Sequence, residues 1–258
     1  LYTLTAWTAL SGDQFAGNTR LECGMAGIRH DDVTCLGPGT RQLVGGDDWT
    51  HGVVASLHDD GGNVSQVIDA GEFTDPDYLS NPVNRCYFCK SHLYAAIARH
   101  SDAPIVSGTN LDDLSDFRPG LDAARNHRVR HPFVEARIDK STVRAIARGL
   151  DLDDVAALPA SPCLSSRVET GLRVTAHSLR LVHEVESLVR RQVVASSVRC
   201  RVRREGLVIE LDDAAFERLG PDRQQSLREE IAQLAAARDQ GAPVLFARYR
   251  TGSAFLRE

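Results

Sequence analysis

The sequence predicts an α/β fold, in which a layered domain with a parallel sheet precedes a small α+β domain. Two observations support this class. Between Val67 and Thr175, helical segments surround a short apolar run, which is typical of α/β layering. After Thr175 the order changes to a helix, two strands, a helix and a strand. We place the boundary near 169–175, so that the two domains span 67–172 and 173–258.

Residues 1–66 do not follow this scheme. Eleven of the 20 glycines lie in this stretch, and no helical periodicity persists over ten residues. The plausible strand fragments are short, such as 52–55. We therefore expect an atypical segment there that is poorly ordered or irregular.

The middle of the chain shows two helices and one strand. Residues 91–99 (SHLYAAIAR) predict a helix. The apolar run 103–107 predicts a buried strand that leaves into a loop at Gly108, the edge where α/β sheets bind ligands. A second helix is expected over 141–149, with Ser141 as its N-cap and a glycine at its end.

The tail is regular. An apolar stripe predicts a helix over 176–194, and a second helix is expected over 224–238. Strands are predicted at 197–204, 207–211 and 244–249. The first of these strands alternates strictly and reads as half-buried. Its three outward residues are Arg199, Arg201 and Arg203.

Composition excludes several classes of protein. The 258 residues are 42% hydrophobic with a net charge of −5, which argues against a basic nucleic-acid binder. No run of 18 apolar residues is present, as a transmembrane helix would require. The first residues lack the basic start of a secretory signal. We expect a cytoplasmic protein without membrane contact.

Three cysteines form the first candidate site. Cys86 and Cys89 have the C-x-x-C spacing that reaches one metal ion or cluster, and the neighbouring Arg85 and Lys90 favour thiolates. The pair alone fits half a zinc site, a redox pair or two buried thiols. Cys163 follows a proline in a predicted loop and alone fits a buried structural thiol. Together the three thiolates would leave one iron of a cubane cluster open.

Two further groups of charges are candidates for binding. The loop from Gly108 to Gly120 carries Asp112, Asp113 and Asp116, which suit Mg²⁺ with its waters. Its Arg118 suits a carboxylate or phosphate. A solvated acidic loop with helix caps explains the same residues. The arginine row of the 197–204 strand needs an anion or an acidic partner, unless that face is solvated.

These segments together resemble the LarE family, the ATP-dependent sacrificial sulfur transferases of the PP-loop ATP pyrophosphatase superfamily. The resemblance rests on NRCYFCK (84–90), GTNLDDLSDFRPG (108–120) and PCLSSR (162–167), with VRCRVRREGLVIEL (198–211) and RYRTGS (248–253) in the tail. It implies a parallel-sheet PP-loop domain of the adenine nucleotide alpha hydrolase type. It also implies a homo-oligomer that acts on a small nucleotide and not on nucleic acid.

The resemblance further implies a reaction. Such enzymes use ATP and Mg²⁺ to adenylate a carboxylate of a pyridinium mononucleotide, and sulfur then gives a thiocarboxylate on the way to a nickel-pincer cofactor. Cys86, Cys89 and Cys163 match the members thought to hold a [4Fe-4S] cluster with an extra sulfide. Phosphate binding falls to Arg199 and Arg201. The full implied set for nucleotide and substrate is Gly108, Asn110, Asp112, Asp116, Arg118, Arg167, Glu186, Arg199 and Arg201.

The chain departs from this family in its first part. The S-G-G-x-D-S loop that cradles pyrophosphate is missing, and Ser11-Gly12-Asp13 does not replace it. Either the loop diverged or residues 1–66 are not in the original reading frame, and the abrupt change near Val67 favours the second explanation. ATP binding and enzyme activity therefore stay open. The alternatives are a tRNA or other PP-loop thiolation enzyme, and an inactive iron–sulfur or zinc-binding remnant.

Overall fold

The computed structural model describes residues 53–59, 62–100, 102–157, 162–239 and 241–254. The chain forms two compact units. The first unit comprises Leu1–Asp75 and Asn84–Pro162, and the second comprises Pro76–Val83 and Cys163–Glu258. The units therefore divide ahead of the stretch 169–175 in which the sequence places a boundary, and the short segment 76–83 belongs to the second unit.

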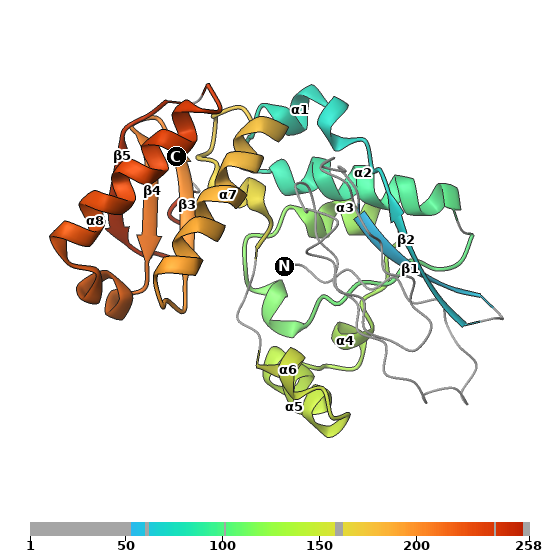
Figure 1. The fold of residues 1–258 in the computed structure, drawn as a ribbon. Coiled ribbons are helices and arrows are strands. Elements are labelled where there is room, and N and C mark those ends of the chain that lie inside the picture. Colours follow the sequence, from blue (N-terminus) through green and yellow to red (C-terminus); the bar gives the residue numbers. More distant parts are fainter. Residues whose placement is uncertain (1–52, 60–61, 101, 158–161, 240, 255–258) are drawn as a thin grey trace. The chain divides into compact units, whose positions relative to one another are not determined.

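The second unit is built around a three-stranded sheet in the order β3-β4-β5 (Figure 1). Strands β3 and β4 are antiparallel, whereas β4 and β5 are parallel and are connected through helix α8. This order confirms the α+β tail. The elements of the unit are α1 (Pro76–Leu79), η4 (Leu164–Arg167), α7 (Ala176–Gln192), β3 (Val198–Arg203), β4 (Gly206–Leu211), α8 (Asp213–Ala236) and β5 (Val244–Arg248).

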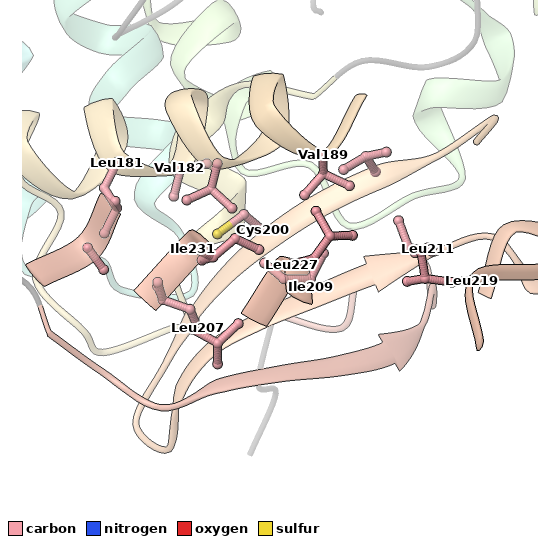
Figure 2. Packing of buried hydrophobic residues seen from close by; sticks show 14 of the residues in the cluster. Leu181, Val182, Val189, Cys200, Leu207, Ile209, Leu211, Leu219, Leu227 and Ile231 are labelled. Atoms are coloured by element: carbon pink, nitrogen blue, oxygen red, sulfur yellow. The ribbon is translucent and has the colours of Figure 1, made fainter. Parts of the chain in front are cut away.

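The core of the second unit lies between its helices and one face of the sheet. Helix α7 begins at a capping box formed by Thr175 and Ser178. In Figure 2 its Val182 points toward Cys200 of β3. Residues of α8 such as Leu227 complete the cluster, and all of these core side chains are fully buried. The apolar stripe of α7 therefore fixes which face of the sheet is covered.

Element α8 consists of two helical segments joined at a kink, whereas the sequence predicts one helix over 224–238. Its side-chain cap is Asp212, which accepts from the Ala215 N–H, so the helix begins well before residue 224. Gly220 leaves helical geometry at φ 66° and ψ 162°, and Pro221 resumes it. The Gly-Pro pair therefore ends a first helical segment, 213–219, and a second segment runs from 221 to 236.

The first unit contains several short helices and a hairpin. Helices α2 and α3 pack against each other, and Leu93 and Ile97 of α2 and Ala123 and Ala124 of α3 are buried. The elements are β1 (Val53–Asp59), β2 (Gly62–Ile68), η2 (Glu72–Thr74), α2 (Arg85–His100), η3 (Leu111–Leu114), α3 (Gly120–Asn126), α4 (Pro132–Glu135), α5 (Lys140–Gly149) and α6 (Asp153–Ala156). Within the described ranges, the helices are too short or too polar to cross a lipid bilayer.

Two details of the first unit differ from prediction. The 103–107 run is not a strand, because its only described ladder contact is a parallel bridge from Val106 to Arg130. The described residues thus form a mixed α/β structure, and the parallel sheet of a PP-loop domain is not seen among them. Helix α5 is capped by Asp139 rather than Ser141, since the Asp139 side chain accepts from the Thr142 N–H at 2.7 Å.

Most of the 1–66 segment lies outside the described residues. Its described part is regular, because β1 and β2 pair antiparallel from Val53 opposite Ile68 to Asp59 opposite Gly62. The expectation of irregular structure is therefore wrong for 53–59 and 62–66. The missed signal was Asp60-Gly61, a dipeptide that favours tight hairpins.

Candidate functional site

Two of the three arginines in the β3 row are buried and Arg203 is half-buried, which corrects the half-buried strand expected from alternation. Arg199 is 8% exposed and Arg201 is 3% exposed. The acidic partner that the row requires is Glu210 of β4, which lies directly opposite Arg199 in the antiparallel register. Glu210 is itself fully buried. Cross-strand pairing therefore places a carboxylate among the guanidinium groups.

Glu210 is the acceptor for three side chains. The Nε of Arg201 donates to it at 2.8 Å, and an Nη of Arg203 donates at 2.8 Å. The Ser253 hydroxyl donates at 2.6 Å. Arg201 also donates from Nη1 to the backbone oxygen of Ser166 at 3.1 Å, which ties β3 to helix η4.

A second carboxylate, Glu186 of α7, completes this cluster. Arg167 of η4 donates to it from Nε at 2.9 Å and from Nη2 at 3.3 Å, and Arg190 donates at 2.6 Å. The Cys200 N–H donates at 3.0 Å. Burial alone raises the pKa of Glu186, but the charge and hydrogen bonds of Arg167, then Arg190 and Cys200, hold that pKa below its ordinary value.

Among the described residues, the buried members of this cluster carry surplus positive charge. In the part of the chain that the structure describes, they are three arginines, Arg167, Arg199 and Arg201, and two carboxylates, Glu186 and Glu210. Burial, and next the charge of Arg167, lower the pKa of the Arg199 guanidinium, which therefore sits in a cationic environment. An oxyanion such as a phosphate group would relieve this excess, because guanidinium groups bind it through charge-assisted hydrogen bonds.

Arg199 is one of the buried guanidinium groups of this cluster. Its Nη1 donates to the Val198 carbonyl at 2.8 Å, and its guanidinium lies 5.7 Å from the centre of the Tyr249 ring. The ring face attracts the cation and helps to offset its burial. Tyr249 belongs to the RYRTGS stretch that supports the family resemblance.

Cys163 lies beside this cluster. It is the residue before helix η4, with an extended backbone at φ −56° and ψ 154°, which agrees with the predicted loop. Arg167 Nη1 donates to the Cys163 carbonyl at 3.2 Å, and the Ser166 N–H donates to the same oxygen at 2.9 Å. The half-buried thiol thus stands one helical turn before a guanidinium of the cationic cluster.

The C-x-x-C pair lies in the first unit, at the beginning of α2. Cys86 is half-buried and Cys89 is buried. Residues three apart share a helix face, so both sulfurs are on the same side of the first helical turn. The positive end of the helix dipole favours thiolates at this position.

The acidic loop of the first unit acts as a set of caps. Asn110 and Asp113 form a capping box around η3, and Asp112 accepts from the Lys140 N–H at 3.0 Å. Arg118 pairs with Asp113 at 2.8 Å and with Asp116 at 3.3 Å. The residues thus have the structural role that their spacing also allowed, and a Mg²⁺ site stays a prediction. Gly108 belongs to the preceding segment without regular structure.

The second unit brings together Cys163 and the predicted residues Arg167, Glu186, Arg199 and Arg201. The other predicted residues belong to the first unit: Cys86, Cys89, Gly108, Asn110, Asp112, Asp116 and Arg118. Among all described residues, no three His, Cys, Asp or Glu side chains gather as metal ligands do, and the three-cysteine site stays a prediction. Sequence reasoning missed Glu210, although a glutamate within the apolar strand LVIEL is a usable signal.

Comparison with known proteins gives partial matches. The chain is 39% identical over 136 residues to an uncharacterised protein of Synechocystis sp., covering 50% of both chains. It is 30% identical over 139 residues to an uncharacterised protein of Methanocaldococcus jannaschii, covering 52% of this chain and 54% of that protein. Pyridinium-3,5-bisthiocarboxylic acid mononucleotide synthase of Lactiplantibacillus plantarum is 30% identical over 151 residues, covering 55% of this chain and 54% of the synthase. No family model matches. The chain spans about half the length of the curated relatives it matches.

Proposed function

We propose that the chain is a LarE-like sulfur transferase that uses ATP to activate a carboxylate of a pyridinium mononucleotide and converts it to a thiocarboxylate. The observation that carries this proposal is Cys163 at the edge of a buried cluster with surplus positive charge. The partial similarity to the Lactiplantibacillus synthase supports the same chemistry. A sulfur-bearing residue beside a cationic cluster suits a substrate that carries a phosphate group.

Arg199 supplies the main recognition of the substrate phosphate in this proposal. Its guanidinium is buried, and its positive charge is disfavoured by loss of water and next by the charge of Arg167. A phosphate dianion would therefore bind more strongly here than at an exposed arginine. Arg201 adds charge, but Glu210 and Ser166 already fix its orientation. In this proposal Arg199 binds the phosphate and Arg201 adds to the positive charge around it.

The reaction balances as two substitutions. A carboxylate oxygen of the substrate attacks the α-phosphorus of ATP, pyrophosphate leaves, and an acyl adenylate forms. A sulfur nucleophile then attacks the acyl carbon, the carbon–oxygen bond to AMP breaks, and a thiocarboxylate remains. Adenylation serves to replace a poor leaving group, an oxide ion, by AMP. For ATP and its Mg²⁺ we propose the loop that contains Asp112 and Asp116.

The thiols would hold an iron–sulfur cluster. Cys86 and Cys89 fit two of its ligand positions, because they share one face at the positive end of α2, and Cys163 would be the third. When bound, such a [4Fe-4S] cluster supplies a sulfide through the iron that no cysteine ligates. The residues of the second unit hold the substrate and keep its phosphate paired.

Pyrophosphate release tests the activity. The full chain, purified without oxygen, is mixed with ATP and the pyridinium mononucleotide, and the product is analysed by mass spectrometry. We expect pyrophosphate release that depends on the mononucleotide, and a KM for it that rises about tenfold or more in Arg199→Gln. Arg125→Gln is the matched control, because Arg125 is exposed and its one ion pair among the described residues is with Asp122. Absence of substrate-dependent pyrophosphate release from the folded protein would refute the function.

Metal analysis tests the thiols. We expect iron in the wild-type chain, and its loss together with the thiocarboxylate product in Cys163→Ala. Cys200→Ala is the matched control, because the Cys200 thiol is fully buried in the core and burial raises its pKa. Iron that persists in Cys163→Ala would remove this residue from the cluster. Zinc in place of iron, without pyrophosphate release, would favour the inactive remnant.

A further inference from the structure

The arginine row does not end at the buried cluster. Arg203, the last residue of β3, borders a hollow of about 540 Å³ together with the end of β5 and the turn after it. That turn is residues 250–253, Arg-Thr-Gly-Ser. The proposed sulfur transfer does not use Arg203, Arg250 or this turn.

The negative charge at the hollow is already neutralised. Glu210 is its one carboxylate among the described lining residues, and it accepts from Arg201, Arg203 and Ser253. A carboxylate with three close donors is a weak acceptor for further cations. The lining therefore presents the remaining guanidinium charge to a ligand that enters the hollow.

The arginines at the hollow differ in how far they are satisfied. Arg248 is directed to Asp213 at 2.9 Å and Glu217 at 3.1 Å, outside the lining. Within the described ranges the Arg250 side chain forms no ion pair or hydrogen bond, and Arg250 is exposed. The Nε of Arg203 is buried and has no hydrogen-bond partner among the described residues. A buried donor left unpaired costs free energy, which an incoming acceptor would recover.

We propose that this hollow binds a phosphate monoester, as a second anion site beyond the one at Arg199. Arg203 and Arg250 supply two guanidinium groups, and the Thr251 hydroxyl supplies a neutral donor. Gly252 has φ 74°, a left-handed conformation that lets the chain turn sharply around the ligand. The volume exceeds that of a bare phosphate ion and accommodates a small organic group attached to it.

Calorimetric titration of the full chain tests this site with two probes, inorganic phosphate and AMP. Because Arg199 is a separate anion site, the titrations are made in the Arg199→Gln background as well as in the wild type. We expect binding that survives Arg199→Gln and weakens about tenfold or more on adding Arg250→Gln. Arg250→Lys should retain most of the affinity, since it keeps the charge. Circular dichroism confirms folding, and Arg125→Gln is the control.

The outcomes separate the two proposals. Tighter binding of AMP than of inorganic phosphate supports a monoester, whereas equal affinity shows a site for the free ion and overturns the monoester assignment. Binding that Arg199→Gln abolishes and Arg250→Gln leaves unchanged means a single anion site, and overturns this inference while leaving the proposed function intact. Loss of pyrophosphate release with intact Arg250-dependent binding overturns the proposed function and leaves this inference intact.

Discussion

Arg201 and Glu210 form an ion pair across neighbouring strands, with 2.8 Å between Nε and Oε2, and the two side chains are only 4% and 2% exposed. Removing one partner of such a pair leaves a buried charge without compensation. We predict that Glu210→Ala lowers the free energy of unfolding by about 3–5 kcal/mol. Urea denaturation followed by circular dichroism measures this change.

Arg248→Gln is the matched control for that prediction. It removes ion pairs to Asp213 and Glu217, but all three side chains are at least 47% exposed. Exposed pairs contribute about 0–1 kcal/mol, so the control should stay close to the wild type. A loss in Glu210→Ala no larger than in Arg248→Gln would show that the buried pair does not stabilise the sheet.

Glu186 should make stability sensitive to acid. Its folded-state pKa lies below the ordinary 4.5, so its contribution is present above that value and is lost as the pH falls through the folded-state pKa. We predict that Glu186→Gln is less stable at pH 7 and loses less stability than the wild type on acidification below pH 4.5. Denaturation curves at several pH values compare the two. Parallel decline in both proteins would assign the acid sensitivity to other groups.

Glu72 should change the pH dependence of stability in the opposite direction to Glu186. Burial raises the pKa of this carboxyl, and its Oε2 is buried without a hydrogen-bond partner in the described structure. A raised pKa favours the folded state below pH 4.5 and costs stability as the pH rises through the folded-state value. We predict that Glu72→Gln stabilises the chain at pH 7 by about 1–2 kcal/mol. A Tm at pH 7 equal to or below that of the wild type would count against this reading.

Gly206 should not tolerate a side chain. It has φ 133°, and a Cβ there would lie 2.3 Å from the Pro243 carbonyl oxygen, which accepts from the Leu207 N–H. The strand pair β4–β5 would have to separate locally. We predict that Gly206→Ala costs about 2–4 kcal/mol of unfolding free energy. Gly149→Ala is the comparison, because nothing lies within 4 Å of a Cβ there. Equal stability of both variants would contradict the close approach.

The tail could be predicted because its signals are local. Alternation along β3 correctly separated Cys200 from Arg201, and the apolar stripe correctly gave α7. The carboxylate that balances the arginine row could not be predicted from local signals, because its position depends on the strand register that places Arg199 opposite Glu210. Alternation alone does not distinguish a solvated row from a row buried against a carboxylate.

The first unit was harder to predict. Ser141 and Asp139 are both good caps two residues apart, and the choice between them is made by backbone geometry. The apolar run at 103–107 had the composition of a strand, but a strand requires neighbours, and the described residues offer Arg130 alone as a bridge partner. The spacing of Asp112 fits both a magnesium ligand and a cap, and the cap depends on the Lys140 N–H, a donor 28 residues away that the sequence does not place beside it.

The segment Pro76–Val83 has a consequence for dissecting the molecule. It belongs to the second unit although residues of the first unit flank it on both sides. Its Asn81 donates to the carbonyls of Val168 and Glu169, and Tyr78 is hydrogen-bonded to Ser165. A fragment that begins at Cys163 would lack a piece of its own interior. Independent expression of that domain therefore needs the octapeptide supplied in trans or grafted on by a linker.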